Sequence, residues 1–121
     1  MNLLAISLLG GIGASCRYLL DVFVQRRHST GLPLGTVAVN VSGSAVTGAL
    51  LGLYWSGHLG PGPWDVMVVG FLGGYTTAST ISFETVRLLE ERRVLAAATL
   101  SLGTLAAALG FAALAAVLCG P

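Results

Sequence analysis

The chain has 121 residues, of which 55% are hydrophobic and only 9% are charged. A soluble domain of this size needs a larger charged surface, so the composition predicts an integral membrane protein. The length suits a single transmembrane domain over residues 1–121, with about four spans of roughly 20 residues each. The formal net charge is only +1 and the sequence has no basic patch, which argues against nucleic acid as a partner.

The first predicted span covers residues 3–24 and carries two charges. Arg17 and Asp21 lie four residues apart, so they share one helical face and can pair. Either charge is costly against lipid, which places both side chains against protein, water or the interface. Alternatively, Arg17 extends to the lipid headgroups near the end of the span. Cys16, like Cys119 near the other terminus, has no metal-ligand spacing and is interpreted as a free buried thiol.

The second predicted span, residues 34–55, has no formal charge and is rich in small and polar residues. Ser44, Gly48 and Gly52 recur every four residues, which predicts a small-residue stripe for tight helix packing. Asn40 lies in the middle of the span, where its amide must form hydrogen bonds. Its partner is either a neighbouring helix, in a structural role, or a solute that passes through.

The third predicted span, residues 64–89, contains the most unusual segment of the chain. Residues 70–84 hold three glycines and six hydroxyl side chains within fifteen positions. Glycine lowers helix stability, and Ser and Thr offer the backbone competing hydrogen bonds, so a helix break is predicted. Non-helical backbone at membrane depth must be buried in protein or line a wet cavity, which indicates an ion or substrate site. The fourth predicted span, residues 94–118, is rich in Ala and Leu and is uncharged.

The arginines are distributed unevenly between the two sides of the membrane. Those in or beside the first and third loops are Arg26, Arg27, Arg87, Arg92 and Arg93. The second loop, residues 56–63, contains no Arg or Lys. The positive-inside rule therefore predicts one fixed orientation, with the first and third loops in the cytoplasm and both termini outside.

Three sequence motifs occur in order along the chain. They are Gly-x-Gly-Ala-x-x-Arg-Tyr at 11–18, Gly-Thr-x-x-x-Asn-x-x-Gly-Ser at 35–44 and Gly-Phe-x-Gly-Gly-x-Thr-Thr-x-Ser-Thr-x-Ser-x-Glu at 70–84. With them, the chain resembles the Fluc (CrcB) fluoride channels of bacteria along nearly its whole length. The resemblance implies an all-α fold of four transmembrane helices with a broken third helix. It also implies an antiparallel dimer with two narrow pores at the interface, in the bacterial inner membrane.

The resemblance implies passive fluoride efflux that lowers fluoride toxicity in the cytoplasm, with a structural sodium ion at the dimer centre. The carbonyls of Gly73 and Thr76 match those that hold sodium in the family. This chemistry is reasonable, because a hard cation takes oxygen ligands and a helix break frees carbonyls. Arg17 and Glu84 match family positions to which we assign possible supporting roles. The residues that match the anion pathway are Asn40, Thr36, Ser79, Thr80 and Thr99.

The chain departs from the family at two phenylalanines of the third span. The family pattern Thr-Thr-Phe-Ser-Thr-Phe-Ser places Ala78 and Ile81 at the two ring positions. In the family these rings present electropositive edges to fluoride, which is strongly hydrated and needs aimed donors to replace its water. Phe83 follows Ile81 by two residues, so it points in a different helical direction and cannot replace the ring.

Two assemblies are compatible with this departure. One is a homodimer that conducts through altered side chains or conducts poorly. The other is a heterodimer with a homologous subunit of opposite orientation, in which one pore can degenerate. The lost rings and the single predicted orientation both favour the heterodimer, since an antiparallel homodimer requires each chain to insert both ways.

Two other functions stay open. One is a non-conducting, structural subunit, which the altered ring positions favour. The other is a small multidrug transporter, which would need a membrane-embedded carboxylate. Asp21 and Glu84 are the candidates, both near span ends, and no aromatic cage accompanies them. The sequence shows no constellation of nucleophile and base or of metal ligands, which argues against an enzyme.

Overall fold

The computed structural model describes residues 2–121 and is entirely helical over its regular elements. Three spans are continuous helices: α1 (Leu3–Arg27), α2 (Leu34–Trp55) and α6 (Val94–Cys119). The third span, Pro61–Glu90, is built from four consecutive pieces. They are α3 (Pro61–Trp64), the π-helix η1 (Asp65–Leu72), α4 (Gly73–Tyr75) and α5 (Ala78–Glu90). All four spans are long and apolar enough to cross a membrane, which confirms the predicted four-helix membrane fold with a broken third helix.

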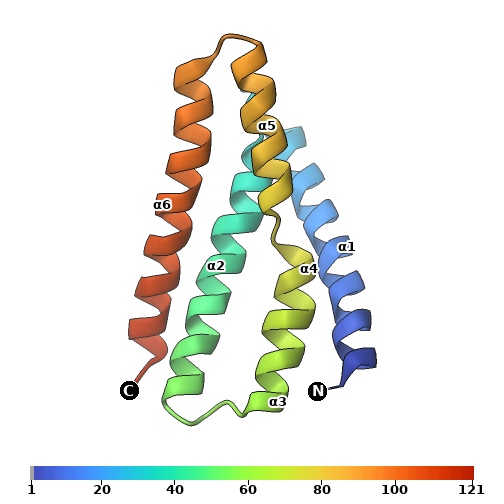
Figure 1. The fold of residues 1–121 in the computed structure, drawn as a ribbon, viewed down its shortest axis with the longest axis vertical. Helices are drawn as coiled ribbons and strands as arrows, with labels where there is room; N and C mark the ends of the chain where they lie inside the picture. The colour runs from blue at the N-terminus through green and yellow to red at the C-terminus, as the bar shows by residue number, and fades with distance from the viewer. Residues whose placement is uncertain (1) are drawn as a thin grey trace.

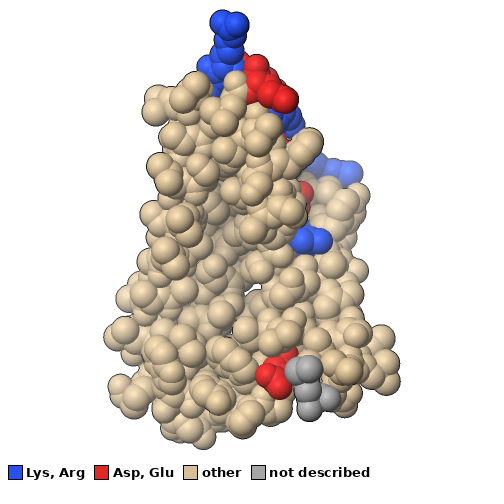
Figure 2. All heavy atoms as spheres, viewed as in Figure 1, with Lys and Arg blue, Asp and Glu red and all other residues tan. Residues whose placement is uncertain are grey.

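The connections alternate between the two ends of the bundle (Figure 1). Both termini and the α2–α3 loop lie at one end, and the α1–α2 and α5–α6 loops lie at the other. Most charged side chains visible in Figure 2 gather at the end that carries the two arginine-containing loops, and below them the surface is largely uncharged. We call this end the arginine end. The structure therefore places the arginine-rich loops together, as their alternation in the sequence predicts.

Helices α2 and α6 pack along most of their length because α2 presents glycines to α6. A Cβ atom on Gly48 would collide with the carbonyl oxygen of Ala112, and one on Gly52 would lie 2.5 Å from the carbonyl oxygen of Ala116. Real Cβ atoms do not approach backbone oxygen this closely, so only glycine permits this helix separation. Small residues allow such close approach in membranes, where packing rather than water exclusion drives association. The predicted stripe is confirmed at these two positions.

A second set of glycines joins α1 to the first half of the third span. A Cβ atom on Gly13 would collide with the carbonyl of Phe71, and one on Gly74 with the carbonyl of Gly10. Up to Leu72 this half of the span follows a π-helix, in which the Gly73 N–H reaches the carbonyl oxygen of Val68, five residues earlier. The sequence patterns did not predict this wider winding, which occurs frequently at functional sites.

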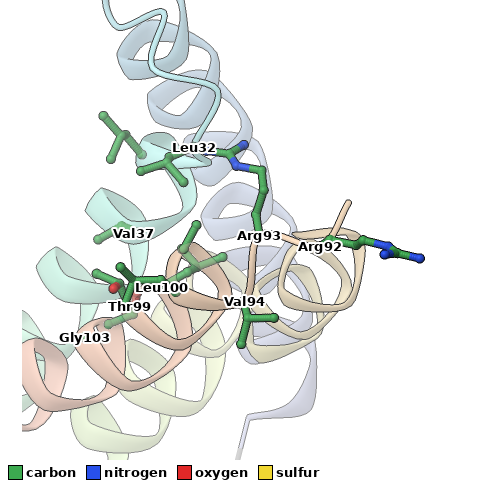
Figure 3. A pocket seen from close by; sticks show the side chains of 12 residues that line it. Leu32, Val37, Arg92, Arg93, Val94, Thr99, Leu100 and Gly103 are labelled. Carbon is green, nitrogen blue, oxygen red and sulfur yellow. The ribbon is translucent and has the colours of Figure 1, made fainter. Parts of the chain in front are cut away.

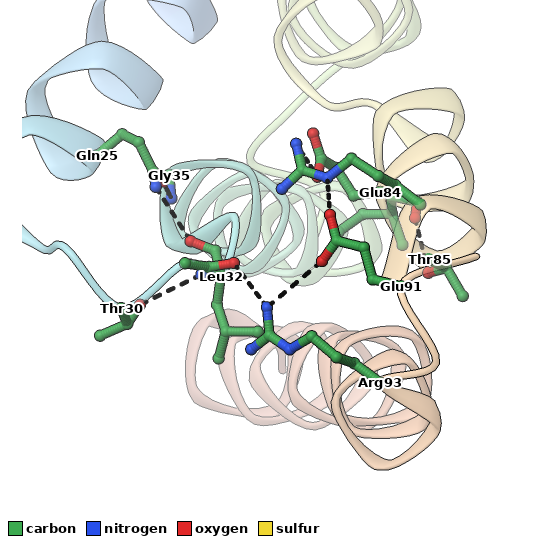
Figure 4. Close-up of polar contacts among 11 residues, drawn as sticks. Gln25, Thr30, Leu32, Gly35, Glu84, Thr85, Glu91 and Arg93 are labelled. Carbon is green, nitrogen blue, oxygen red and sulfur yellow. Dashed lines mark hydrogen bonds and ion pairs between the residues drawn. The ribbon is translucent and has the colours of Figure 1, made fainter. Parts of the chain in front are cut away.

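The arginine end is closed by a small apolar core and by contacts between loops. Leu88, Ala97 and Leu100 are buried between α5 and α6, next to Leu32 of the first loop. Arg93 donates from Nη1 to the Gly31 carbonyl at 3.4 Å and forms an ion pair with Glu91 at 3.8 Å (Figure 4). These contacts tie the first loop to the third, so the cytoplasmic ends predicted for all four helices are held together.

We expect Gly48→Ala to destabilise the protein, because the added methyl group must displace α6 backbone. Overpacking of this kind costs about 1–3 kcal/mol. Thermal unfolding followed by circular dichroism in detergent measures the effect. Gly110→Ala is the matched control: a Cβ there meets nothing within 4 Å, so the melting temperature should be unchanged or higher. Equal melting temperatures for the two variants would contradict the assignment of Gly48 to the α2–α6 contact.

Candidate ion pathway around the helix break

The third span loses helical geometry at two residues in its middle. Thr76 has φ −80° and ψ 157°, and Thr77 has φ −150° and ψ 117°, so both are extended between α4 and α5. Each is a β-branched hydroxyl residue, a type that favours extended backbone and helix caps over helix interiors. Gly73 and Gly74 come directly before them and weaken the preceding turn. The local sequence therefore favours a break here.

The side chain of Asn40 in α2 forms hydrogen bonds with the backbone of the break. Its Nδ2 donates to the Thr77 carbonyl and its Oδ1 accepts from the Thr77 N–H, each at 2.7 Å. One amide side chain thus satisfies both polar groups of an extended residue at membrane depth, where an unpaired group is expensive. The second hydrogen on Nδ2 has no partner in these two bonds and stays available. Asn40 has the structural role that the sequence left open, with one donor to spare.

At the break, two backbone carbonyls lose the hydrogen bonds that they would accept in a continuous helix. The Thr77 N–H, which in a continuous helix would bond to Gly73 four residues back, goes to Asn40 instead. The Thr80 N–H, which would bond to Thr76, goes to the side-chain oxygen of Thr77 at 3.3 Å. The carbonyls of Gly73 and Thr76 therefore lose their usual donors. These are the two carbonyls that match the family's sodium ligands by motif position.

The Thr77 hydroxyl group organises the start of α5. It caps the helix through the Thr80 N–H and lies 3.1 Å from both the Ser79 and Thr80 hydroxyl oxygens. The Thr77 side chain is almost fully buried, whereas Ser79 is exposed. The three hydroxyl groups form one cluster, so Ser79 and Thr80 lie together near the break, where the resemblance places them.

Arg17 lies against the break from α1. Its Nη1 is 3.5 Å from the Thr76 carbonyl oxygen, and the side chain is only partly exposed. It does not pair with Asp21: within residues 2–121 the ion pairs under 4.0 Å involve Arg87 and Arg93 with Glu84 and Glu91. Arg17 therefore faces protein, as the cost of a charge against lipid predicts, and it contacts the Thr76 carbonyl instead of pairing with Asp21.

Two small polar cavities lead from the arginine end toward the break. The outer cavity, about 210 Å³, is lined in part by Gln25, Glu84 and Arg87. The inner cavity, about 180 Å³, is lined in part by Arg17 and Thr77. The residues that line both are Asp21, Thr36 and Thr80. The cavities are therefore neighbours, and together they reach from the loops to the broken helix.

The charges along these two cavities nearly balance. Glu84 Oε2 is buried, lies 3.3 Å from Arg87 Nη1 and accepts no hydrogen bond within residues 2–121. Asp21 and Arg17 face the inner cavity from the same helix. Carboxylate and guanidinium groups therefore both line these cavities, together with the neutral hydroxyl residues Thr36 and Thr80.

A third cavity, about 330 Å³, lies on the other side of the break, and we call it the midspan cavity. Asn40 and Thr77 border it, together with both altered ring positions, Ala78 and Ile81. No aromatic residue is among its described lining residues, and Phe83 is 67% exposed. The helical direction predicted for Phe83 is therefore confirmed, because its ring does not enter this cavity.

Thr99 is separated from the other candidate pathway residues. It is exposed on α6 and lines a groove at the arginine end with Leu95 and Gly103 (Figure 3). That groove shares Thr104, but none of Asn40, Thr36 or Thr80, with the cavities near the break. Within one chain, Thr99 therefore does not join the cluster of candidate residues.

Two residues that are central to the structure, Thr77 and Thr104, have no individual role predicted from the sequence. Thr77 is one, and its signal is a hydroxyl residue that follows two glycines and precedes a periodic helix, which is typical of an N-cap. Thr104 is the other: its hydroxyl is buried beside the midspan cavity and forms no hydrogen bond within the described residues. Nothing in its spacing distinguishes Thr104 from serines and threonines that bond to their own helix.

Three continuous membrane-spanning helices and one broken one define the class of protein. It is a multi-pass membrane protein whose polar groups converge on non-helical backbone, the arrangement by which transport proteins build ion sites. The family model for "CrcB-like protein, Camphor Resistance (CrcB)" matches residues 4–119. The chain therefore belongs to the CrcB family.

Named relatives cover most of the chain. It is 44% identical over 112 residues to "Fluoride-specific ion channel FluC 1" of Leifsonia xyli, covering 92% of this chain and 81% of that protein. It is 43% identical over 97 residues to "Fluoride-specific ion channel FluC" of Citrifermentans bemidjiense, covering 79% and 78%. It is 42% identical over 112 residues to "Fluoride-specific ion channel FluC 3" of Bifidobacterium longum, covering 88% and 92%.

We expect Asn40→Ala to loosen the helix break. The change leaves the Thr77 N–H and carbonyl without partners, at about 1–3 kcal/mol for each orphaned group. Hydrogen exchange in detergent should show faster exchange at the Thr77 amide, with a lower melting temperature. Ser44→Ala is the control, because Ser44 lies one turn away and borders the midspan cavity, and its side chain makes no hydrogen bond within residues 2–121. Unchanged Thr77 exchange in Asn40→Ala would contradict the clamp.

Proposed function

We propose that the chain is a subunit of a fluoride channel, which allows passive fluoride efflux across the bacterial inner membrane and lowers cytoplasmic fluoride toxicity. The observation that carries this proposal is the 44% identity, over 92% of the chain, to a protein named as a fluoride-specific ion channel. Passive conduction requires a path rather than a reaction centre. The hydrogen-bond donors around the break are better suited to line such a path than to catalyse a reaction.

The arrangement of neutral donors supports fluoride as the solute. Fluoride gives up a tightly bound water shell only to closely aimed hydrogen-bond donors. Asn40 has one N–H left after it clamps Thr77, and it borders the midspan cavity. Thr36 and Thr80 offer hydroxyl groups on the arginine side of the break. In this proposal an anion passes from the hydroxyl groups of the polar cavities to the Asn40 amide, with Ser79 beside that path and Thr99 contributing from the α6 surface.

We assign a structural, non-transported sodium site to the carbonyls of Gly73 and Thr76. Neutral oxygen ligands suit a hard cation, and both carbonyls lack their usual helical donors because Asn40 and Thr77 take those N–H groups. Arg17 lies 3.5 Å from the Thr76 oxygen, a long contact that leaves the second lone pair of that carbonyl free. A bound sodium ion would supply the positive charge that fixes the broken helices of two subunits together.

The assembly we propose is an antiparallel dimer, formed either with a second copy or with a homologous subunit. The arginine bias between the two ends favours a partner of opposite orientation, since one chain then needs only one insertion direction. In a heterodimer this chain could be the non-conducting subunit. The observation that favours this second function is the midspan cavity, where Ala78 and Ile81 present no ring edge.

We expect liposomes that contain this chain alone to show little fluoride efflux if the heterodimer is correct. A fluoride electrode measures the release after a potassium ionophore is added. Co-reconstitution with a homologous subunit that carries both phenylalanines should restore rapid efflux. Robust efflux from the chain alone would refute the heterodimer and leave the fluoride channel itself intact.

In the conducting assembly, we expect Asn40→Asp to reduce fluoride efflux at least tenfold. The substitution keeps the acceptor to the Thr77 N–H but replaces both Nδ2 donors with a negative charge that repels anions. Asn40→Asp must first elute as a stable dimer, so that a loss of efflux cannot reflect unfolding. Efflux equal to that of the unsubstituted protein would exclude Asn40 from the pathway.

Removal of sodium should also lower fluoride efflux in the conducting assembly. Reconstitution in N-methylglucamine in place of sodium is the test, and returning sodium should restore the rate. Because the proposed ligands are backbone carbonyls, Thr76→Val should keep the same dependence on sodium concentration. A weaker apparent sodium affinity in Thr76→Val would instead identify the side-chain hydroxyl as a ligand and contradict the carbonyl assignment.

A further inference from the structure

A tyrosine lies directly before the helix break and connects it to α2. Tyr75 is the last residue of α4, and its hydroxyl oxygen lies 2.9 Å from that of Ser42 in α2. Its ring stacks on Phe71 of η1, with the ring centroids 5.8 Å apart and the planes 13° apart. Ser42 and Tyr75 fall at unspecified positions of the three sequence motifs, so the resemblance to the fluoride channels assigns no role to either residue.

The hydrogen bond between these two hydroxyl groups has a defined direction. Ser42 has one hydroxyl hydrogen, and its oxygen also lies 3.1 Å from the Val39 carbonyl oxygen, which can only accept. Ser42 therefore donates to Val39 and accepts from Tyr75. Lipid offers a phenol no acceptor in the middle of a span, and an unpaired hydroxyl group away from water costs free energy. The Tyr75 hydroxyl group is thus held on α2.

Gly43 of α2 makes room for the two residues that lead into the break. A Cβ atom on Gly43 would collide with the methyl group of Thr76 and would lie 3.1 Å from the Tyr75 ring. The N–H and the hydroxyl group of Thr76 both reach the Leu72 carbonyl oxygen, each at 2.9 Å. Thr76 is therefore held both along its own chain and against α2.

These contacts fix one end of the peptide unit that joins Thr76 to Thr77. The peptide unit is planar and trans, so its C=O and its N–H point in opposite directions. At the other end, the Asn40 side chain accepts the Thr77 N–H at 2.7 Å. The direction of the Thr76 carbonyl therefore depends on Tyr75 at one end of this unit and on Asn40 at the other.

We propose that Tyr75 is a positioning residue for the Thr76 carbonyl and acts through its hydrogen bond to Ser42. The inference rests on the sodium site of the proposed function, because it concerns the alignment of one of the carbonyl ligands. A hard cation takes oxygen ligands, and a ligand that is already held in place costs less to order on binding. Phenylalanine at position 75 would keep the ring contacts but lose the bond to α2, so the carbonyl would be less well aligned.

The dependence of stability on sodium tests this role without a flux measurement. A ligand that binds the folded state raises the melting temperature, so melting of the purified dimer at increasing sodium, with N-methylglucamine as the replacement cation, gives an apparent affinity. We expect Tyr75→Phe to weaken sodium binding about five-fold, the effect of losing one hydrogen bond. Ser42→Ala should weaken it equally, and the double variant should lose no more than either single variant.

Tyr54→Phe is the matched control. It removes the same oxygen atom from a tyrosine at the far end of α2, whose hydroxyl group forms no hydrogen bond within residues 2–121, so sodium affinity should not change. Hydrogen exchange in sodium-free buffer provides a second measurement. Exchange at the Thr76 and Thr77 amides should be faster in Tyr75→Phe than in Tyr54→Phe.

Unchanged sodium affinity in Tyr75→Phe would overturn the proposal even if amide exchange is faster, because Tyr75 would then support packing alone. A double variant with the product of the two single losses would also overturn it, since Tyr75 would then act through a contact other than Ser42. If sodium does not raise the melting temperature of the unsubstituted protein, the sodium site itself fails and this role fails with it. The unsubstituted protein therefore distinguishes the two failures.

Discussion

The whole arrangement depends on one amide side chain that satisfies an extended residue inside the membrane. Lipid offers no hydrogen bonds, so a break in a spanning helix survives only where protein supplies both a donor and an acceptor. Asn40 supplies both to Thr77 in one planar group. That pair frees the Gly73 carbonyl, and the Thr77 hydroxyl group, which caps α5, frees the Thr76 carbonyl. A leucine or serine at this position could not provide both contacts.

Interhelical glycines set the helix separations around Asn40 and the break, and Gly43 of α2 lies directly against the Thr76 side chain. Gly48 and Gly52 hold α2 against α6, and Gly13 and Gly74 hold α1 against the first half of the third span. These contacts fix the helices on either side of the break at short separations. Because they are steric, they tolerate little change in residue size. The polar chemistry therefore depends on residues that carry no polar side chain.

Much of this could be predicted from the sequence, for identifiable reasons. The four spans follow from runs of apolar residues, and the break follows from glycines and hydroxyl groups gathered in residues 70–84. The contact of Asn40 with Thr77 could not be predicted, because 37 positions separate them and only the packing brings them together. The predicted Arg17–Asp21 pair was wrong for a related reason. Helical spacing permits this pair, but in the folded chain Arg17 contacts the Thr76 carbonyl instead.

The π-helix of the third span has a consequence for changes in chain length. Each turn of a π-helix holds about one residue more than a turn of an α-helix. The π-helix Asp65–Leu72 therefore contains more residues than an α-helix with the same number of turns. A single-residue deletion there would convert wide winding to ordinary α-helix and leave the Gly74 contact and the Asn40 clamp in register. The same deletion in α5 would rotate every following side chain by about 100°. Insertions and deletions among natural variants should therefore concentrate before Gly73.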